Sequence, residues 1–146
     1  MIGGDVPART YRVYFARAVD ELPRTEVLAR GRALAAQLRK SGVTLVDPVA
    51  AWDARSARSG PADLISSDLS LLGTCHAVLM DMTIPDRNYV GCVCELVYAH
   101  LWGIPSVVWV GTTGFERRPW LRHHAAAVVR TETEAVARLL ALLPRR

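Results

Sequence analysis

The feature of this 146-residue chain that most constrains its fold is a regular alternation of strand-like and helix-like segments. Short runs rich in β-branched, aromatic and aliphatic residues alternate with longer segments whose apolar residues recur at helical spacing. The predicted strands are 11–16, 43–47, 77–81, 106–110 and 126–130. The predicted helices are 24–41, 61–72, 91–102 and 132–143. The longest predicted loops are 49–60, which surrounds Trp52, and 111–122.

This alternation predicts an α/β fold. A helix between two strands carries the chain back to the same edge of the sheet, so the strands run parallel and helices cover both faces. Five strands fit the flavodoxin-like, doubly wound order in a three-layer α/β/α arrangement. No repeat or linker interrupts the pattern, and we expect a single domain over residues 1–146 with its core at about 11–143.

Local signals mark several helix boundaries. Gly42 follows the first predicted helix at the position where a left-handed cap is expected. Pro61 stands near the first position of the next helix. Thr131 and Glu134 have the spacing of a capping box at the head of the last helix.

Composition narrows the class of protein. Hydrophobic residues make up 51% and charged residues 22%, which is typical of a soluble globular protein. The apolar runs are too short to cross a bilayer and the first ten residues lack the core of a signal peptide, so we expect a cytoplasmic protein without membrane association. Only Lys40 among the 18 basic residues is a lysine, and the arginines are scattered, which disfavours a nucleic-acid polymer as partner.

The three cysteines, Cys75, Cys92 and Cys94, are an odd number, and we expect reduced thiols. Cys92 and Cys94 are separated by one residue and lack a second pair of ligands at the spacing of a zinc site. We therefore expect neither a bound metal nor another cofactor.

The predicted fold also indicates where a ligand binds. In open parallel sheets, ligands lie beyond the carboxyl ends of the strands. This rule selects the segments that follow Ala16, Asp47, Asp81 and Val110.

Glu95 is the first candidate for catalysis. It is expected at the start of the helix after the third strand, where the partial positive charge of the helix favours an ionised carboxylate. Gly91 removes a side chain where a ligand would have to approach closely. A carboxylate at this place can act as a nucleophile towards a sugar C1. The alternative is that Glu95 only favours the start of the helix.

Four motifs of this chain occur in an order and at a spacing that resemble those of the nucleoside 2-deoxyribosyltransferase family and its relatives, the nucleotide N-glycosidases. The resemblance spans about Tyr11 to Val110 and implies a flavodoxin-like domain. The motifs are Tyr14-Phe15-Ala16, Asp68, Gly91…Glu95-Leu96…Ala99 and Gly103-Ile104-Pro105.

The resemblance implies roles for individual residues. Glu95 would attack C1 of the sugar, expel the base and form a covalent glycosyl-enzyme, which a second base or water would release. Asp68 would contact the base and help its protonation, and Tyr14 and Phe15 would lie near the sugar and the nucleophile. On residues alone, Asp68 could equally be a solvated helix position, and the two aromatics could be ordinary strand residues.

One position departs from the family pattern. Family members commonly have an aspartate one or two residues before the signature glycine, whereas this chain has Asn88-Tyr89-Val90 there. Asp86 or Asn88 could contact the substrate in its place, or both could serve only as turn residues.

The remaining candidates for substrate binding lie in the same loops. Ala16 closes the first motif, and Arg17 directly after it, like Arg87 before Glu95, could bind a 5′-phosphate or simply face solvent. Trp52 could stack on a base or be an ordinary buried tryptophan.

The resemblance thus implies an enzyme that cleaves the N-glycosidic bond of a nucleoside or nucleoside 5′-monophosphate, and no residue decides between transferase and hydrolase. The alternatives are a nucleotide-binding or sensing module without turnover, and a structural oligomeric protein. Family sites are completed by a neighbouring subunit, so we expect a homodimer or higher homo-oligomer. The candidates for donation across the interface are Phe115, Trp120, Arg122 and His123, in segment 114–124.

Overall fold

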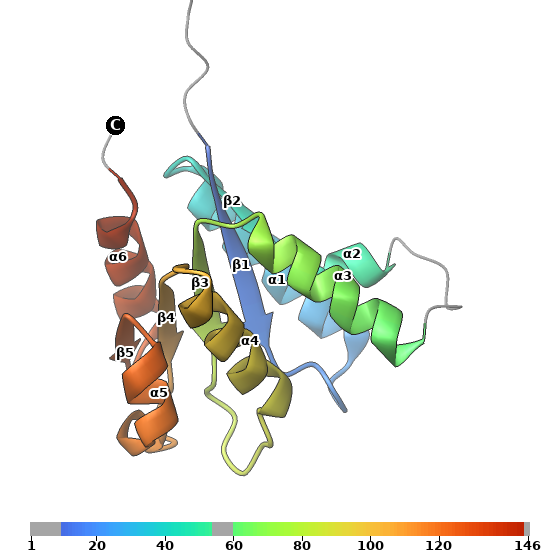
Figure 1. Cartoon of the computed structure of the whole chain (residues 1–146). Coiled ribbons are helices and arrows are strands. Elements are labelled where there is room, and N and C mark those ends of the chain that lie inside the picture. Colours follow the sequence, from blue (N-terminus) through green and yellow to red (C-terminus); the bar gives the residue numbers. More distant parts are fainter. Residues whose placement is uncertain (1–9, 54–59, 145–146) are drawn as a thin grey trace, which may run out of the picture.

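The computed structural model describes residues 10–53 and 60–144. Its five strands form one parallel sheet in the order β2-β1-β3-β4-β5, which is the flavodoxin-like order (Figure 1). The strands are β1 (Tyr11–Arg17), β2 (Val43–Val46), β3 (Ala77–Asp81), β4 (Ser106–Trp109) and β5 (Ala127–Val129). The predicted fold class is confirmed.

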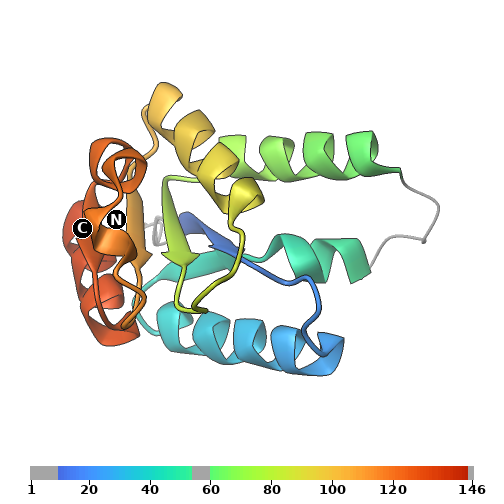
Figure 2. The ribbon, with the colours of Figure 1, turned by 90° about the horizontal axis from the view of Figure 1, so that it is seen from below.

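Helices cover both faces of this sheet. They are α1 (Arg24–Arg39), α2 (Pro48–Asp53), α3 (Pro61–Gly73), α4 (Val90–Leu101), α5 (Pro119–His124) and α6 (Glu132–Leu142), with a short 3-10 helix, η1, at Phe115–Arg117. Helices α1 and α6 pack on one face, and α3, α4 and α5 pack on the other (Figure 2). In the described part of the chain, every helix is too short or too polar to span a membrane.

Strand residues alternate between the two helical layers. Tyr14 and Val78 belong to the core beneath α3, α4 and α5, whereas Val13 and Leu79 belong to the core beneath α1 and α6. All four side chains are fully buried. Because both faces are covered, the central strands are apolar throughout and do not show the polar alternation of a half-exposed sheet.

Two of the boundary signals in the sequence are confirmed, and the third is confirmed in part. Gly42 has the expected left-handed φ of 74°, but α1 ends at Arg39 with Lys40 as its C-cap, so Gly42 lies in the turn before β2. Pro61 is the first residue of α3. The Thr131 hydroxyl accepts a hydrogen bond of 3.1 Å from the backbone N–H of Glu134 and so caps α6.

The predicted loops 49–60 and 111–122 were wrong in part, because each overlaps a six-residue helix and the second also contains η1. In α2, Pro48 starts the helix and the Asp47 carboxylate accepts a 3.1 Å hydrogen bond from the backbone N–H of Val49. In α5, Pro119 starts the helix and Leu121 is 1% exposed in the core. Helices this short depend on tertiary packing, which a polar local sequence does not reveal.

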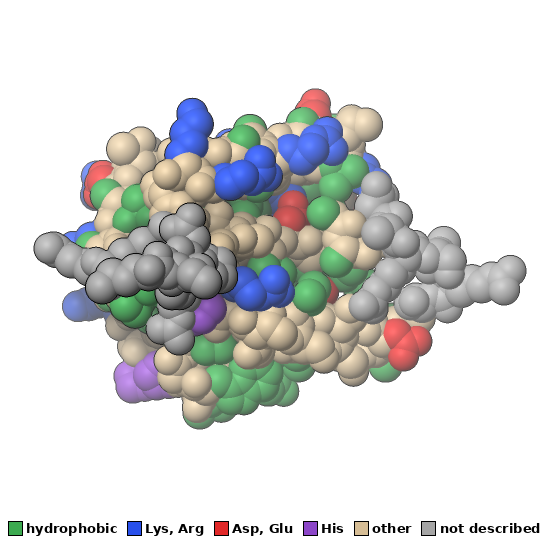
Figure 3. Space-filling view, turned by 90° about the horizontal axis from the view of Figure 1, so that it is seen from above, with side chains coloured by type: hydrophobic (Ala, Val, Ile, Leu, Met, Phe, Trp, Pro, Cys, Tyr) green, Lys and Arg blue, Asp and Glu red, His purple; other side chains and the backbone are tan. Residues whose placement is uncertain are grey.

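Basic side chains on the face shown in Figure 3 lie in separate patches. Uncharged surface lies between them, so this face does not present the continuous basic stripe that is typical of a nucleic-acid interface.

A buried ion pair joins the ends of β1 and β2. Arg17 Nη2 lies 2.9 Å from Asp47 Oδ2, and the two side chains are 6% and 11% exposed. The Arg17 guanidinium also lies 4.3 Å from the centre of the Phe15 ring. Gly31 of α1 provides the space, because a Cβ there would lie 2.2 Å from Asp47 Oδ2. Burial lowers the pKa of Arg17, and the Asp47 carboxylate partly offsets this.

The substitution Gly31→Ala tests how rigidly this pair is held. The new methyl group must displace Asp47 or helix α1, so we expect the free energy of unfolding to fall by about 1–3 kcal/mol, even though alanine favours helices. Urea denaturation would measure the change. Gly91→Ala in α4 is the matched control, because nothing lies within 4 Å of its added Cβ, and it should not lose stability. Unchanged stability in Gly31→Ala would contradict a tightly held pair.

Candidate active site

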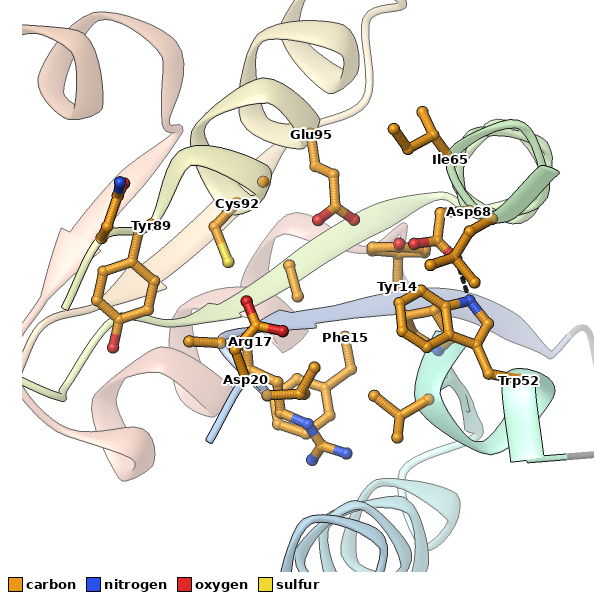
Figure 4. A pocket seen from close by; sticks show the side chains of 18 residues that line it. Tyr14, Phe15, Arg17, Asp20, Trp52, Ile65, Asp68, Tyr89, Cys92 and Glu95 are labelled. Atoms are coloured by element: carbon orange, nitrogen blue, oxygen red, sulfur yellow. Dashed lines mark hydrogen bonds between the residues drawn. The ribbon is translucent and has the colours of Figure 1, made fainter. Parts of the chain in front are cut away.

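A cavity of about 240 Å³ opens at the carboxyl edge of the sheet, between the end of β1 and helices α2, α3 and α4 (Figure 4). This is the edge that the strand pattern indicated. Nine residues predicted from the sequence line the cavity: Tyr14, Phe15, Ala16, Arg17, Trp52, Asp68, Asn88, Gly91 and Glu95.

Glu95 lies in the second turn of α4, as the sixth residue of the helix. Burial raises its pKa from 4.5 to about 7, which is opposite to the direction expected from the start of a helix. The favourable charge of a helix N-terminus falls off within the first turn, so desolvation dominates here. Close to neutral pH, Glu95 therefore exists in both its protonated and its ionised form.

Two side chains from other elements face Glu95. Figure 4 shows the Tyr14 hydroxyl of β1 and the Asp68 carboxylate of α3 turned towards the Glu95 carboxylate. The Tyr14 phenol lowers the pKa of Glu95 and partly offsets burial, whereas the charge of Asp68 raises it further. Burial, followed by the nearby charge of Glu95, raises the pKa of Tyr14 well above its usual value, so Tyr14 stays a neutral phenol.

Polar atoms at this point lack partners. Within the described part of the chain, Tyr14 Oη and Glu95 Oε2 are buried and have no hydrogen-bond partner of standard geometry. Tyr14 Oη nevertheless lies close enough to Glu95 to lower the pKa of that carboxyl as a hydrogen-bond donor. Buried polar atoms are normally paired, and an unpaired set at a cavity wall is typical of a place that a ligand completes.

Asp68 is held from the opposite side. Trp52 Nε1 donates a 2.9 Å hydrogen bond to Asp68 Oδ1, which links α2 to α3 (Figure 4). Both residues were predicted to contact substrate, but the bond between them was not foreseen, because α2 was predicted as a loop.

Arg17, Asn88 and Gly91 also line the cavity. Arg17 is paired with Asp47, while its Nε and Nη1 have no hydrogen-bond partner among the described residues. The Asn88 side chain accepts a 3.1 Å hydrogen bond from the backbone N–H of Val90, at the start of α4. Gly91 is exposed, and nothing crowds the position of its missing Cβ.

Two predicted residues do not line the cavity. Asp86 is exposed, with a left-handed φ of 58°, in the loop before α4. Arg87 turns back and donates a hydrogen bond to the backbone carbonyl of Asp20. Neither Asp86 nor Arg87 belongs to the cavity wall, and their expected contacts with substrate stay a prediction.

The sequence did not single out the other nine residues that line the cavity as substrate contacts, among them Asp20, Tyr89 and Cys92. Asp20 comes shortly after β1, so it could have been predicted from the rule that ligands bind beyond the carboxyl ends of parallel strands. Tyr89 stands where the family resemblance led us to expect an aspartate, and its hydroxyl accepts a 2.9 Å hydrogen bond from the backbone N–H of Ile84. Burial raises the pKa of the Cys92 thiol, which therefore stays protonated.

The described residues contain no group of three or more His, Cys, Asp or Glu side chains arranged to hold a metal ion. The three cysteines are free thiols.

The predicted interface segment divides into buried and exposed parts. Phe115 is 7% exposed and packs edge-on against Tyr89 at 5.9 Å, inside the core of its own chain. Its expected donation to a neighbouring subunit is not compatible with this position. Trp120, Arg122 and His123 are exposed.

No protein-family model and no curated protein matches the chain. Among solved structures, a 2-deoxyribosyltransferase from Leishmania mexicana matches with a TM-score of 0.72 and 15% identity, over 92% of this chain and 99% of that chain. A 2-deoxyribosyltransferase from Bacillus psychrosaccharolyticus matches with a TM-score of 0.66 and 16% identity, over 84% and 88%. A CMP N-glycosidase from Clostridium botulinum matches with a TM-score of 0.58 and 14% identity, over 90% and 99%. The resemblance seen in the sequence is confirmed for the fold.

The raised pKa of Glu95 predicts how stability depends on pH. The folded protein holds this proton more tightly than the unfolded chain, so the contribution is fully present below pH 4.5 and is lost as pH rises through about 7. Glu95→Gln cannot lose a proton. We expect its free energy of unfolding to rise relative to the wild type across this range by up to about 3 kcal/mol. Urea denaturation at several pH values would measure the difference, and a constant difference would contradict a raised pKa.

Proposed function

We propose that this protein is an enzyme that cleaves the N-glycosidic bond of a nucleoside or nucleoside 5′-monophosphate, with Glu95 as the nucleophile. The observation that carries the proposal is the meeting of a buried carboxylate, a neutral phenol and a second carboxylate in one cavity. The fold, shared with 2-deoxyribosyltransferases and with a CMP N-glycosidase, supports this reading of the chemistry.

In the first step, an oxygen of ionised Glu95 attacks C1′ of the sugar. The new C1′–O bond forms as the C1′–N bond breaks, and the base leaves with the electron pair of that bond. Asp68 in its acid form gives the base a proton and becomes a carboxylate. Tyr14 stays a phenol and can donate a hydrogen bond to the Glu95 carboxylate, which keeps its reacting oxygen in place.

In the second step, water or another base attacks C1′ from the side that the first base left. The incoming group loses a proton to the Asp68 carboxylate, the ester to Glu95 breaks, and both carboxyl groups return to their starting forms. Two inversions at C1′ give overall retention. With a second base the reaction is a transfer, and with water it is a hydrolysis.

The cavity walls suit the parts of such a substrate. The indole of Trp52 and the side chain of Ile65 offer apolar surface near Asp68, where the base would lie. Asp20 and Asn88 also line the cavity and offer polar groups for hydrogen bonds to sugar hydroxyls. The positive charge of Arg17 in the cavity wall is suited to a 5′-phosphate, although Asp47 already neutralises part of this charge.

A panel of nucleosides and nucleotides, with and without a 5′-phosphate, tests the proposal by chromatography of the free base. We expect Glu95→Gln to reduce base release by about a thousandfold or more, since the amide is a poor nucleophile. Wild-type activity should fall as pH drops below about 7, because Glu95 gains a proton, and should fall again at higher pH, where Asp68 no longer holds the proton that the base needs.

Glu116→Gln is the matched control. Glu116 is also partly buried, but it lies in η1 beside Arg130, outside the cavity lining, and the substitution should leave base release unchanged. If nucleotides bind and no base is released, and Glu95→Gln does not alter binding, the protein is a sensing module and not an enzyme.

We also propose that copies of this chain associate through the outer face of α4 and α5. Tyr98, Leu101, Trp102 and Trp120 are 41%, 71%, 47% and 63% exposed, which is unusual for large apolar side chains so close together. An apolar groove of about 510 Å³ runs between α4 and Trp120. Because α4 also carries Glu95, a second copy seated there would lie next to the cavity.

Light scattering tests this association. We expect the wild type to be a dimer or larger, and Leu101→Asp to be a folded monomer, because a charge cannot be buried in an apolar interface without a large cost. Leu142→Asp is the control, since Leu142 is similarly exposed, at 43%, but lies on α6 across the sheet. A monomeric wild type would contradict the proposal.

A further inference from the structure

The hydrogen bond between Trp52 and Asp68 gives Trp52 a role besides lining the cavity. Trp52, in α2, lies 16 residues before Asp68 in the chain, and its Nε1 donates a hydrogen bond to Asp68 Oδ1 at 2.9 Å. Both side chains line the cavity, and Asp68 is close enough to affect the pKa values of Tyr14 and Glu95. The contact therefore connects α2 to the group that faces the reacting carboxylate.

The indole nitrogen determines how Asp68 can hold a proton. An indole N–H is only a donor and has no acceptor function. Asp68 Oδ1 must therefore accept in both protonation states of the carboxyl group. A proton on Asp68 is then favoured on Oδ2, the oxygen that the indole does not occupy.

We propose that Trp52 is a positioning residue that acts through Asp68, by occupying Oδ1 so that the proton given to the leaving base is carried on Oδ2. This inference rests on the proposed function, because it concerns transfer of a proton to a departing base. Among the residues that the structure describes, Tyr14 from β1 and Glu95 from α4 also face Asp68, and neither can replace the indole. Tyr14 has its hydroxyl towards Glu95, and Glu95 brings charge of the same sign as Asp68.

Substrates with different leaving groups separate this role from a purely structural one. A purine or pyrimidine needs a proton as it leaves, whereas the nitrophenolate of a nitrophenyl riboside or deoxyriboside leaves as a stable anion. In Trp52→Phe, which keeps an aromatic ring and removes the N–H, we expect kcat for the nucleoside to fall about tenfold with little change in KM. Turnover of the nitrophenyl glycoside should stay close to that of the wild type.

A double-mutant cycle provides the second readout. If Trp52 acts through Asp68, then Trp52→Phe should cause little further loss in an Asp68→Asn background. Tyr11→Phe is the control, because Tyr11 belongs to the core beneath α1 and α6 and does not line this cavity. Replacement of Trp52 by benzothienyl-alanine, which exchanges the N–H for sulfur in a ring of nearly the same shape, gives a second variant should the phenylalanine disturb folding.

Each outcome has a definite meaning. A selective loss on nucleosides that vanishes in the Asp68→Asn background supports the inference. Equal losses on both substrates, additive losses in the cycle, or no loss on nucleosides would overturn it while leaving the proposed function intact. A wild-type protein that releases no base from any nucleoside would overturn both.

Discussion

Both faces of the central parallel sheet must be removed from water, and the rest of the structure depends on this constraint. Strand β1 pairs with β2 along one edge and with β3 along the other, so it lies inside the sheet. Helices on both sides of the sheet therefore have to cover its two faces. The same winding brings the carboxyl ends of the strands to one edge. The cavity lies there, at the end of β1, where the order of the strands reverses.

Successive side chains of β1 point to opposite faces of the sheet, so reactive and structural side chains lie in different layers. Tyr14 points into the layer of α3 and α4, where it meets Glu95, and Phe15 points into the layer of α1 and α6. The Arg17 guanidinium lies over the Phe15 ring and is paired with Asp47, which ties β1 to the end of β2. One short segment thus supplies a phenol to the cavity and fastens the strand end that positions it.

Two opposing physical effects determine the protonation state of Glu95. A helix N-terminus stabilises a nearby carboxylate by about 0.3–1 kcal/mol and acts mainly on the first turn. Burial raises the pKa of Glu95 to about 7, which corresponds to about 3 kcal/mol against the ionised form. Burial has the larger effect because Glu95 lies in the second turn of α4, where its side chain is placed between α3 and β1. A carboxyl group tuned in this way can change its charge near neutral pH, which is the property that catalytic carboxyl groups require.

The sequence by itself determined what is encoded locally or by regular spacing: the order of strands and helices, the left-handed glycine Gly42 in the turn after the first helix, the capping box at Thr131, and Glu95 as the leading carboxylate. Only the tertiary structure decided the rest. Helices α2 and α5 are too short to be stable without packing, so local composition could not predict them. The bond between Trp52 and Asp68, the positions of Asp20 and Tyr89 in the cavity wall, and the charge of Glu95 all depend on elements brought together from distant parts of the chain. Burial and proximity are properties of the folded chain, and a local pattern of residues does not contain them.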